Sequence, residues 1–265
     1  MLSAVEVTTD GFTYGLITPV LGFLLAVLGS ALGLRCTVRA LSVERRKRAG
    51  WLVLGAVSIG TGIFTMHFIA MMGFTASSVP IDYDLGVTYI SLGVAVLVTG
   101  VGLFLVGYTR HTARLLPVAG VVTGLGVASM HYMGMASMRM TGEIVYNSVL
   151  VGLSLVVAVA AATAALWFAI SVRRFSAAVV ASLLMGVAVT GMHYTGMAAV
   201  SVHAHSTSMM YTRVPLETLL PALAVPMLLL VIVGLFVGLD PMAEEELGRP
   251  DEEQRGARQF GVLQR

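Results

Sequence analysis

The apolar residues of this chain fall into seven long blocks that are separated by short polar segments. Crossing a hydrocarbon core about 30 Å thick takes roughly 20 helical residues, and each block is long enough. A transmembrane β-barrel would instead show short segments of alternating polarity, which this sequence lacks. The pattern therefore predicts an all-α integral membrane protein with seven transmembrane helices. Their expected ranges are 12–34, 51–74, 86–108, 115–138, 148–170, 177–201 and 217–239.

Composition agrees with this pattern, because 57% of the 265 residues are hydrophobic and only 11% are charged. A soluble domain of this length needs more charge to cover its surface. Residues 1–11 are expected to form an outer segment, and they lack the basic start of a cleaved signal peptide. Residues 240–265 are acidic and polar, and we expect a disordered cytoplasmic tail there. The membrane domain is expected over residues 12–239.

The charges between the blocks predict the orientation of the chain. Six basic residues follow the first block, whereas the next connection carries Asp82 and Asp84 and no Lys or Arg. The positive-inside rule then places the N-terminus outside and the C-terminus in the cytoplasm. The basic residues are Arg35, Arg39, Arg45, Arg46, Lys47 and Arg48. Cys36 is the single cysteine, so an intramolecular disulfide and a cysteine-based zinc site are both excluded.

One motif recurs in the second, fourth and sixth predicted helices. Each copy has Gly seven residues before a His, Met one before, an aromatic residue one after, Ala or Gly three after and Met four after. The copies contain Met66, His67 and Met71; Met130, His131 and Met135; and Met192, His193 and Met197. This spacing predicts three tandem helix pairs, about 12–74, 86–138 and 148–201, with 217–239 as a closing helix. The pairs would be related by a pseudo-threefold axis along the membrane normal.

The motif histidines are the candidate functional residues. His67 is expected roughly 10 Å from the outer end of its span, and no predicted span holds a charged residue in its interior. A polar group at such depth is by default a functional candidate. Its partner is another motif histidine, a nearby hydroxyl, a carbonyl, water or a metal. Imidazole binds Zn, Cu, Fe and Ni, and thioether selects Cu(I). The residues therefore favour copper, in one shared site or in two separate ones.

Each feature also has a structural interpretation. Met is a common packing residue, and a buried His often serves only as a hydrogen-bonding group. The glycines at 60, 62, 124, 126 and 186, with Ala70, Gly134 and Gly196, fit close helix approach, which would also draw the three histidines together. His203 and His205 follow the sixth block, where they either capture metal or belong to a solvated loop, and the loop is the favoured interpretation. The chain lacks a nucleotide-binding motif and a basic-aromatic surface for nucleic acid.

At these motifs the sequence resembles the MHYT domain family, whose Met-His-Tyr-Thr run stands intact at Met192 to Thr195. The resemblance covers about residues 12–239. It implies a bacterial inner-membrane sensor domain with outward-facing Met and His residues, proposed to bind copper and through it to sense oxygen, carbon monoxide or nitric oxide. The first motif departs most, with Phe68, Ile69 and Ala70 in place of Tyr, Thr and Gly, and the second has Met133 in place of Thr. Every candidate ligand is retained, but a required tyrosine hydroxyl is put in doubt.

Four functions are compatible with these observations. The first is a non-enzymatic, copper-binding sensor of a diatomic gas or of redox state, which lies in lipid and signals through a separate partner. The second is copper transport, or copper delivery to a membrane oxidase. The third is a purely structural partner subunit. A membrane enzyme is least favoured, because there is no nucleophile or base constellation beyond the histidines, while haem ligation by His and Met is chemically open.

Overall fold

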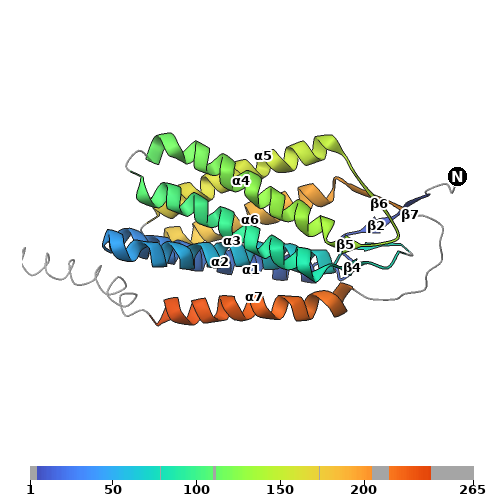
Figure 1. Ribbon diagram of the computed structural model, residues 1–265, viewed down its shortest axis with the longest axis horizontal. Helices are drawn as coiled ribbons and strands as arrows, with labels where there is room; N and C mark the ends of the chain where they lie inside the picture. The colour runs from blue at the N-terminus through green and yellow to red at the C-terminus, as the bar shows by residue number, and fades with distance from the viewer. Residues whose placement is uncertain (1–4, 78, 110–111, 173, 205–214, 240–265) are drawn as a thin grey trace, which may run out of the picture.

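The computed structural model describes residues 5–77, 79–109, 112–172, 174–204 and 215–239 (Figure 1). Within these ranges, seven helices are long and apolar enough to cross a membrane. They are α1 (Ile17–Ser42), α2 (Arg45–Met72), α3 (Leu85–Tyr108), α4 (Thr112–Ala136), α5 (Ser148–Ser171), α6 (Phe175–Met197) and α7 (Pro215–Gly238). The predicted all-α, seven-helix architecture is confirmed, and the chain is a multi-pass membrane protein. The acidic tail predicted at 240–265 lies outside the described residues, and the pseudo-threefold relation stays a prediction.

Helices α1 to α6 form a closed ring. Each packs on the next in chain order, and α6 packs back on α1, while α7 lies outside the ring against α2. Figure 1 shows α7 running along one side of the bundle. The second half of α2 is enclosed most completely, because every residue from Ser58 to Met72 is buried. The first motif is therefore held in the protein interior.

The motif glycines allow the helices to approach closely. A Cβ atom built on Gly60 would lie 2.7 Å from the Cα atom of Val96 on α3. One on Gly124 would lie 2.5 Å from the Cα atom of Val159 on α5. Such contacts are shorter than a real Cβ can make, so these positions require glycine. The structure thus accounts for these motif glycines through packing.

Within the described part of the chain, seven short strands gather at one end of the bundle, which we call the strand end (Figure 1). They pair antiparallel in three small sheets, ordered β1-β7-β6, β2-β3 and β4-β5. The strands are β1 (Val5–Val7), β2 (Thr9–Asp10), β3 (Thr75–Ala76), β4 (Asp82–Tyr83), β5 (Met138–Arg139), β6 (Gly142–Tyr146) and β7 (Val200–Ala204). The pattern of apolar blocks did not predict these strands. Helices α2, α4 and α6 all end here, so the strands cover the motif ends of these helices.

The first two helices differ from their predicted ranges for a physical reason. Gly15, at a φ of 60°, lies in a turn before Ile17, so α1 begins five residues later than the apolar block. At the opposite end, both helices extend into the basic segment. Arg48 there donates to the carbonyls of Ala40 and Gly107, at 3.1 and 2.9 Å, and Arg39 stacks over Trp51. The basic residues of this segment thus lie mostly on helices and at the end far from the strands.

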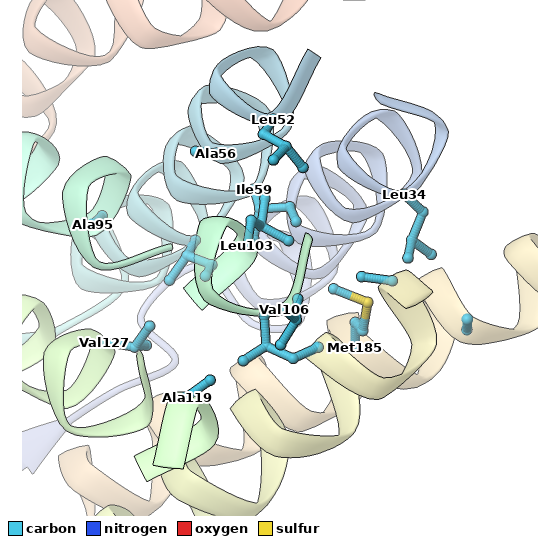
Figure 2. Packing of buried hydrophobic residues seen from close by; sticks show 14 of the residues in the cluster. Leu34, Leu52, Ala56, Ile59, Ala95, Leu103, Val106, Ala119, Val127 and Met185 are labelled. Atoms are coloured by element: carbon cyan, nitrogen blue, oxygen red, sulfur yellow. The ribbon is translucent and has the colours of Figure 1, made fainter. Parts of the chain in front are cut away.

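Small and branched aliphatic residues fill the middle of the bundle. Figure 2 shows part of this core, with Leu103 from α3 and Ile59 from α2 close to Val127 of α4 and Met185 of α6. A second apolar cluster, which includes Phe68, Met71 and Met135, lies nearer the strands. On α4 and α6 the motif histidine stands between members of the two clusters, whereas His67 of α2 lies within the stretch that belongs to the second cluster.

Candidate metal centre

Three helices each supply one motif histidine to a single cluster, which we call the triad. His67 comes from α2, His131 from α4 and His193 from α6, each within five residues of the last residue of its helix. That separation corresponds to about 7 Å of helix. The three side chains are at most 1% exposed. The triad is therefore near the strand end but fully enclosed by protein.

The imidazoles meet through their Nδ1 atoms. The His67–His193, His67–His131 and His131–His193 Nδ1 separations are 3.0, 3.1 and 3.3 Å. The corresponding ring centroids are 4.9 to 5.1 Å apart. Because the nitrogen triangle is smaller than the centroid triangle, every ring turns its Nδ1 inward. Of the two arrangements that the sequence left open, the structure has the single cluster.

Protonation limits what these three nitrogens can do by themselves. A neutral imidazole carries a proton on one nitrogen and a lone pair on the other. Two N–H groups directed at the centre of so small a triangle would bring their hydrogens into contact. At most one Nδ1 can therefore carry a proton, and at least two lone pairs face each other. A cation at the centre removes this repulsion.

The spacing suits a metal ion. Nitrogens that each lie about 2.0–2.1 Å from one ion stand roughly 3.3–3.6 Å apart in trigonal or tetrahedral geometry. The observed separations of 3.0 to 3.3 Å differ from that range by a few tenths of an ångström. Among the described residues, the triad is also the one group of three His, Cys, Asp or Glu side chains with ligand atoms that close. The donor set and its geometry both fit a metal that accepts imidazole nitrogen.

The outward nitrogens lie against the next motif. A Cβ atom on Gly134 of α4 would overlap His67 Nε2, and one on Gly196 of α6 would overlap His131 Nε2. Both Nε2 atoms are buried and lack a hydrogen-bond partner. The small residue three positions after the histidine thus makes room for the ring from another helix. The sequence predicted that these small residues allow close helix approach and so draw the histidines together, but it did not indicate that they contact the rings directly.

The six motif methionines lie on both sides of the triad. Met71 and Met135 are fully buried in the cluster near the strands, with Met197 packed against it. Met130 and Met192 belong to the core on the other side. Met66 is buried and its Cγ faces Gly22 of α1. Five of the six are buried and Met197 is half-buried, and their role as ligands stays a prediction.

The aromatic residues after each histidine pack edge-on against it, with centroid separations of 4.7 to 5.0 Å. Their hydroxyl groups are used differently. Tyr132 bonds to Ser154 at 2.7 Å, the buried hydroxyl of Tyr194 has no partner, and Phe68 has no hydroxyl. A shared hydroxyl function is therefore absent from the three positions.

The remaining candidate histidines do not join the triad. His203 lies in β7, where its backbone pairs with Glu6 and Glu143 on the neighbouring strands. His205 lies outside the described residues. A role for either one in capturing metal stays a prediction.

Comparison with known proteins identifies the repeated unit. The sequence profile described as "Bacterial signalling protein N terminal repeat", or MHYT, matches residues 60–119, 124–182 and 186–246. Each match begins at the glycine seven residues before a triad histidine. The period equals the one read from the sequence, but the phase differs. Each match begins within a motif helix and runs through the helix that follows it, and the first two matches end within the next motif helix.

Three relatives share the membrane part of the chain. The bifunctional diguanylate cyclase/cyclic di-GMP phosphodiesterase MucR of Pseudomonas aeruginosa is 38% identical over 71% of this chain and 28% of its own length. The cyclic di-GMP phosphodiesterase NbdA of the same organism is 34% identical over 73% of this chain and 26% of its own. The signaling protein YkoW of Bacillus subtilis is 31% identical over 72% and 24%.

The chain thus spans about a quarter of the length of these relatives. No solved structure matches it. Three successive profile matches, each containing one triad histidine, show that the chain belongs to the MHYT family of bacterial signalling proteins.

Proposed function

We propose that the triad binds one copper ion and that the chain is the sensing part of a membrane signalling system. The signal is oxygen, carbon monoxide, nitric oxide or redox state. The observation that carries this proposal is the ring of three Nδ1 atoms at 3.0 to 3.3 Å, which has room for one proton at most. A bound cation compensates the remaining lone pairs.

The ligand chemistry favours copper. His67, His131 and His193 would hold the ion through Nδ1, with no carboxylate or thiolate in the cluster. Such a set disfavours Ca²⁺ and Mg²⁺, which take oxygen ligands. Zinc also binds imidazole, but thioether sulfur selects Cu(I). Met66, Met71, Met130, Met135, Met192 and Met197 would supply that sulfur.

The fold suits a sensor because three helices that run the length of the bundle meet at one point. Three protein ligands leave a coordination position for an external molecule. When bound, copper would supply the affinity for that molecule, and the protein would supply the change in packing. A shift of the triad moves α2, α4 and α6 relative to each other, and their other ends lie far from the strand end (Figure 1).

The names of two relatives indicate the class of output. MucR is named for making and degrading cyclic di-GMP, and NbdA for degrading it. We propose that this chain controls the same type of second-messenger signalling through a separate partner and is not itself the enzyme. In this proposal the strand end faces outward across the bacterial inner membrane, with the basic ends of α1 and α2 in the cytoplasm.

Copper transport or delivery to a membrane oxidase is the competing function. A transport path needs further ligands along the helices beyond the triad. One turn away from the strand end, the equivalent positions hold Ile63, Val127 and Val189, which offer no ligand. The lack of ligand side chains at these positions therefore favours a sensor over a copper transporter. Protein-dependent copper flux into vesicles would reverse this preference.

The test is metal analysis of the purified full chain in detergent. We expect about one copper per chain in the wild type and none in the His67→Ala/His131→Ala/His193→Ala variant. His203→Ala is the matched control, because it removes a histidine of β7 that lies outside the triad, and it should retain copper. Copper missing from the wild type, or equal in the wild type and the triple variant, refutes the proposal. An absorption spectrum of the same sample identifies haem if haem is the true occupant.

A further inference from the structure

A small cavity of about 50 Å³ lies in the middle of the bundle. Its wall includes the residues one turn from each triad histidine, on the side away from the strands: Ile63, Val127 and Val189. It also includes the residues two turns away: Ile59, Thr123 and Met185. Figure 2 shows Ile59, Val127 and Met185 in this part of the core. Equivalent positions of all three motif helices therefore form the wall, which places the cavity directly beneath the triad.

The opposite wall comes from α5. Ala158, Ala161, Ala162 and Ala165 line the cavity, a spacing that puts four small side chains on one helix face. Thr99 from α3 also lines it, but its hydroxyl donates to the Ala95 carbonyl at 2.7 Å. The lining also holds Ser30 and Thr123, and the buried Thr123 hydroxyl has no hydrogen-bond partner. The rest of the wall is aliphatic carbon and the thioethers of Met185 and Met192.

Size and polarity define what can enter this cavity. About 10–15 Å³ already accommodates one water, but water stays only where it finds several polar partners. An apolar cavity stays dry and accepts an apolar guest such as xenon. At about 50 Å³ the space fits a molecule of a few atoms. The chemistry of the wall thus selects a small, uncharged, apolar molecule.

The routes to the triad differ on its two sides. Toward the strands, Phe68, Met71 and Met135 are each 0% exposed and pack in one cluster. On the cavity side, the lining residues Ala161, Ala165 and Val189 are partly exposed, and they belong to α5 and α6, which pack on each other. Those surfaces face lipid in a membrane-spanning helix. Apolar gases dissolve in hydrocarbon, so the bilayer itself can supply them along this seam.

We infer that this cavity is the docking chamber for the apolar diatomic molecule and that the molecule reaches the triad from within the membrane, between α5 and α6. The inference rests on the proposed function, because it assigns the ligand's place and route. It also makes a prediction that needs no copper: the cavity binds an apolar atom by itself.

Xenon binding to the full chain in detergent tests the cavity. ¹²⁹Xe NMR should show saturable binding to the wild type. Ala162→Leu fills the cavity and should weaken binding at least tenfold, and Val189→Leu should weaken it in the same direction. Ala164→Leu is the matched control, since it adds the same side chain to the exposed face of α5, and it should bind like the wild type. Size-exclusion profiles show that each variant is folded.

Carbon monoxide binding to the Cu(I)-loaded protein tests the role of the cavity. Ala162→Leu should lower the carbon monoxide affinity at least tenfold at an unchanged copper-to-protein ratio, and Ala164→Leu should leave it unchanged. The inference is overturned if the wild type shows no saturable xenon binding. It is also overturned if Ala162→Leu and Ala164→Leu have equal effects on xenon binding or on carbon monoxide binding. If the wild type holds no copper, the proposed function fails, whereas the xenon measurement still decides the cavity.

Discussion

The Nε2 atom of His67 lies so close to Gly134 that a Cβ atom on this glycine would overlap it. The same relation joins His131 to Gly196 in the next motif. Each of these rings is therefore positioned by a glycine from another helix, three residues after that helix's own histidine. The geometry of the triad and the packing of α2, α4 and α6 are consequently coupled, and a methyl group at either glycine tests this coupling.

Gly134→Ala should displace the His67 ring and reduce copper affinity at least tenfold. The reason is that a buried ring cannot move away from a new Cβ without changing the Nδ1 triangle. Gly196→Ala should act in the same way through His131. Isothermal titration with Cu(I) measures both. Gly93→Ala on α3 is the control, because a Cβ there meets nothing within 4 Å, and it should bind copper like the wild type. Unchanged affinity in Gly134→Ala would show that the triad does not depend on this contact.

Copper should stabilise the folded chain through the triad. A ligand that binds only the folded state at a free concentration 100 times its Kd adds about 2.7 kcal/mol to the free energy of unfolding. We therefore expect the melting temperature of the wild type to rise with copper and to fall again on chelation. The triple variant with Ala at His67, His131 and His193 should show no rise. A rise of equal size in that variant would place the copper elsewhere, with the β7 histidine as the first candidate.

The architecture and the triad could be predicted from the sequence because their signals are local and repeated. Apolar blocks specify the spans, and the in-register repeats of Met-His identify which three helices carry the site. The sequence did not indicate which imidazole nitrogen turns inward, because that depends on side-chain torsions. It also missed the sheet of β1, β6 and β7, in which Val5–Val7 pairs with residues about 200 positions away. Pairing at such a separation leaves no local pattern.

The Tyr132 hydroxyl should contribute to stability and not to copper binding. It bonds to Ser154 Oγ at 2.7 Å, and Ser154 Oγ in turn donates to the Val151 carbonyl at 2.8 Å. Tyr132→Phe removes one hydrogen bond and leaves Ser154 with its acceptor, so we expect a loss of about 1 kcal/mol in the free energy of unfolding. Ser154→Ala leaves the tyrosine hydroxyl unpaired and should cost more, about 1–3 kcal/mol.

Denaturant titration of the two variants, with copper analysis of the same samples, checks this order. Phe68 serves as the natural comparison, since the first motif has no hydroxyl at this position. A loss of copper in Tyr132→Phe would instead assign the hydroxyl to the metal site.

The strand end should loosen in acid through the Asp84–Arg139 ion pair, whose Nη2–Oδ2 distance is 2.6 Å. The hydrogen bond from Arg139 holds the pKa of the Asp84 carboxyl below its ordinary value of 3.8, with help from the Val87 N–H group. A carboxyl whose pKa is lower in the folded state stabilises that state above the ordinary pKa. This contribution is lost as the pH falls through 3.8 and below.

We therefore expect the wild-type melting temperature to fall more steeply between about pH 5 and pH 3 than that of Asp84→Asn. Asparagine keeps a side-chain oxygen for the Val87 N–H group, so the helix cap remains. Arg139→Gln should flatten the acid dependence in the same way from the other side of the pair. Parallel curves for all three proteins would show that this pair does not contribute to the acid dependence.

The contact between α1 and α2 should tolerate little added volume. A Cβ atom on Gly29 would lie 2.7 Å from both the Cα of Gly62 and the carbonyl oxygen of Ser58, so backbone meets backbone at this point. A flexible side chain could move aside, but these backbone atoms cannot. We therefore expect an added side chain here to lower the stability of the fold by at least about 1–3 kcal/mol, the typical cost of overpacking.

Gly62→Val should therefore sharply reduce the yield of folded, monodisperse protein, measured by size-exclusion chromatography after extraction in mild detergent. Gly93→Val, in the open site on α3, makes the same chemical change without a clash and should extract like the wild type. Equal yields from the two variants would mean that α1 can move away from α2, and the closed ring would then be looser than its packing indicates.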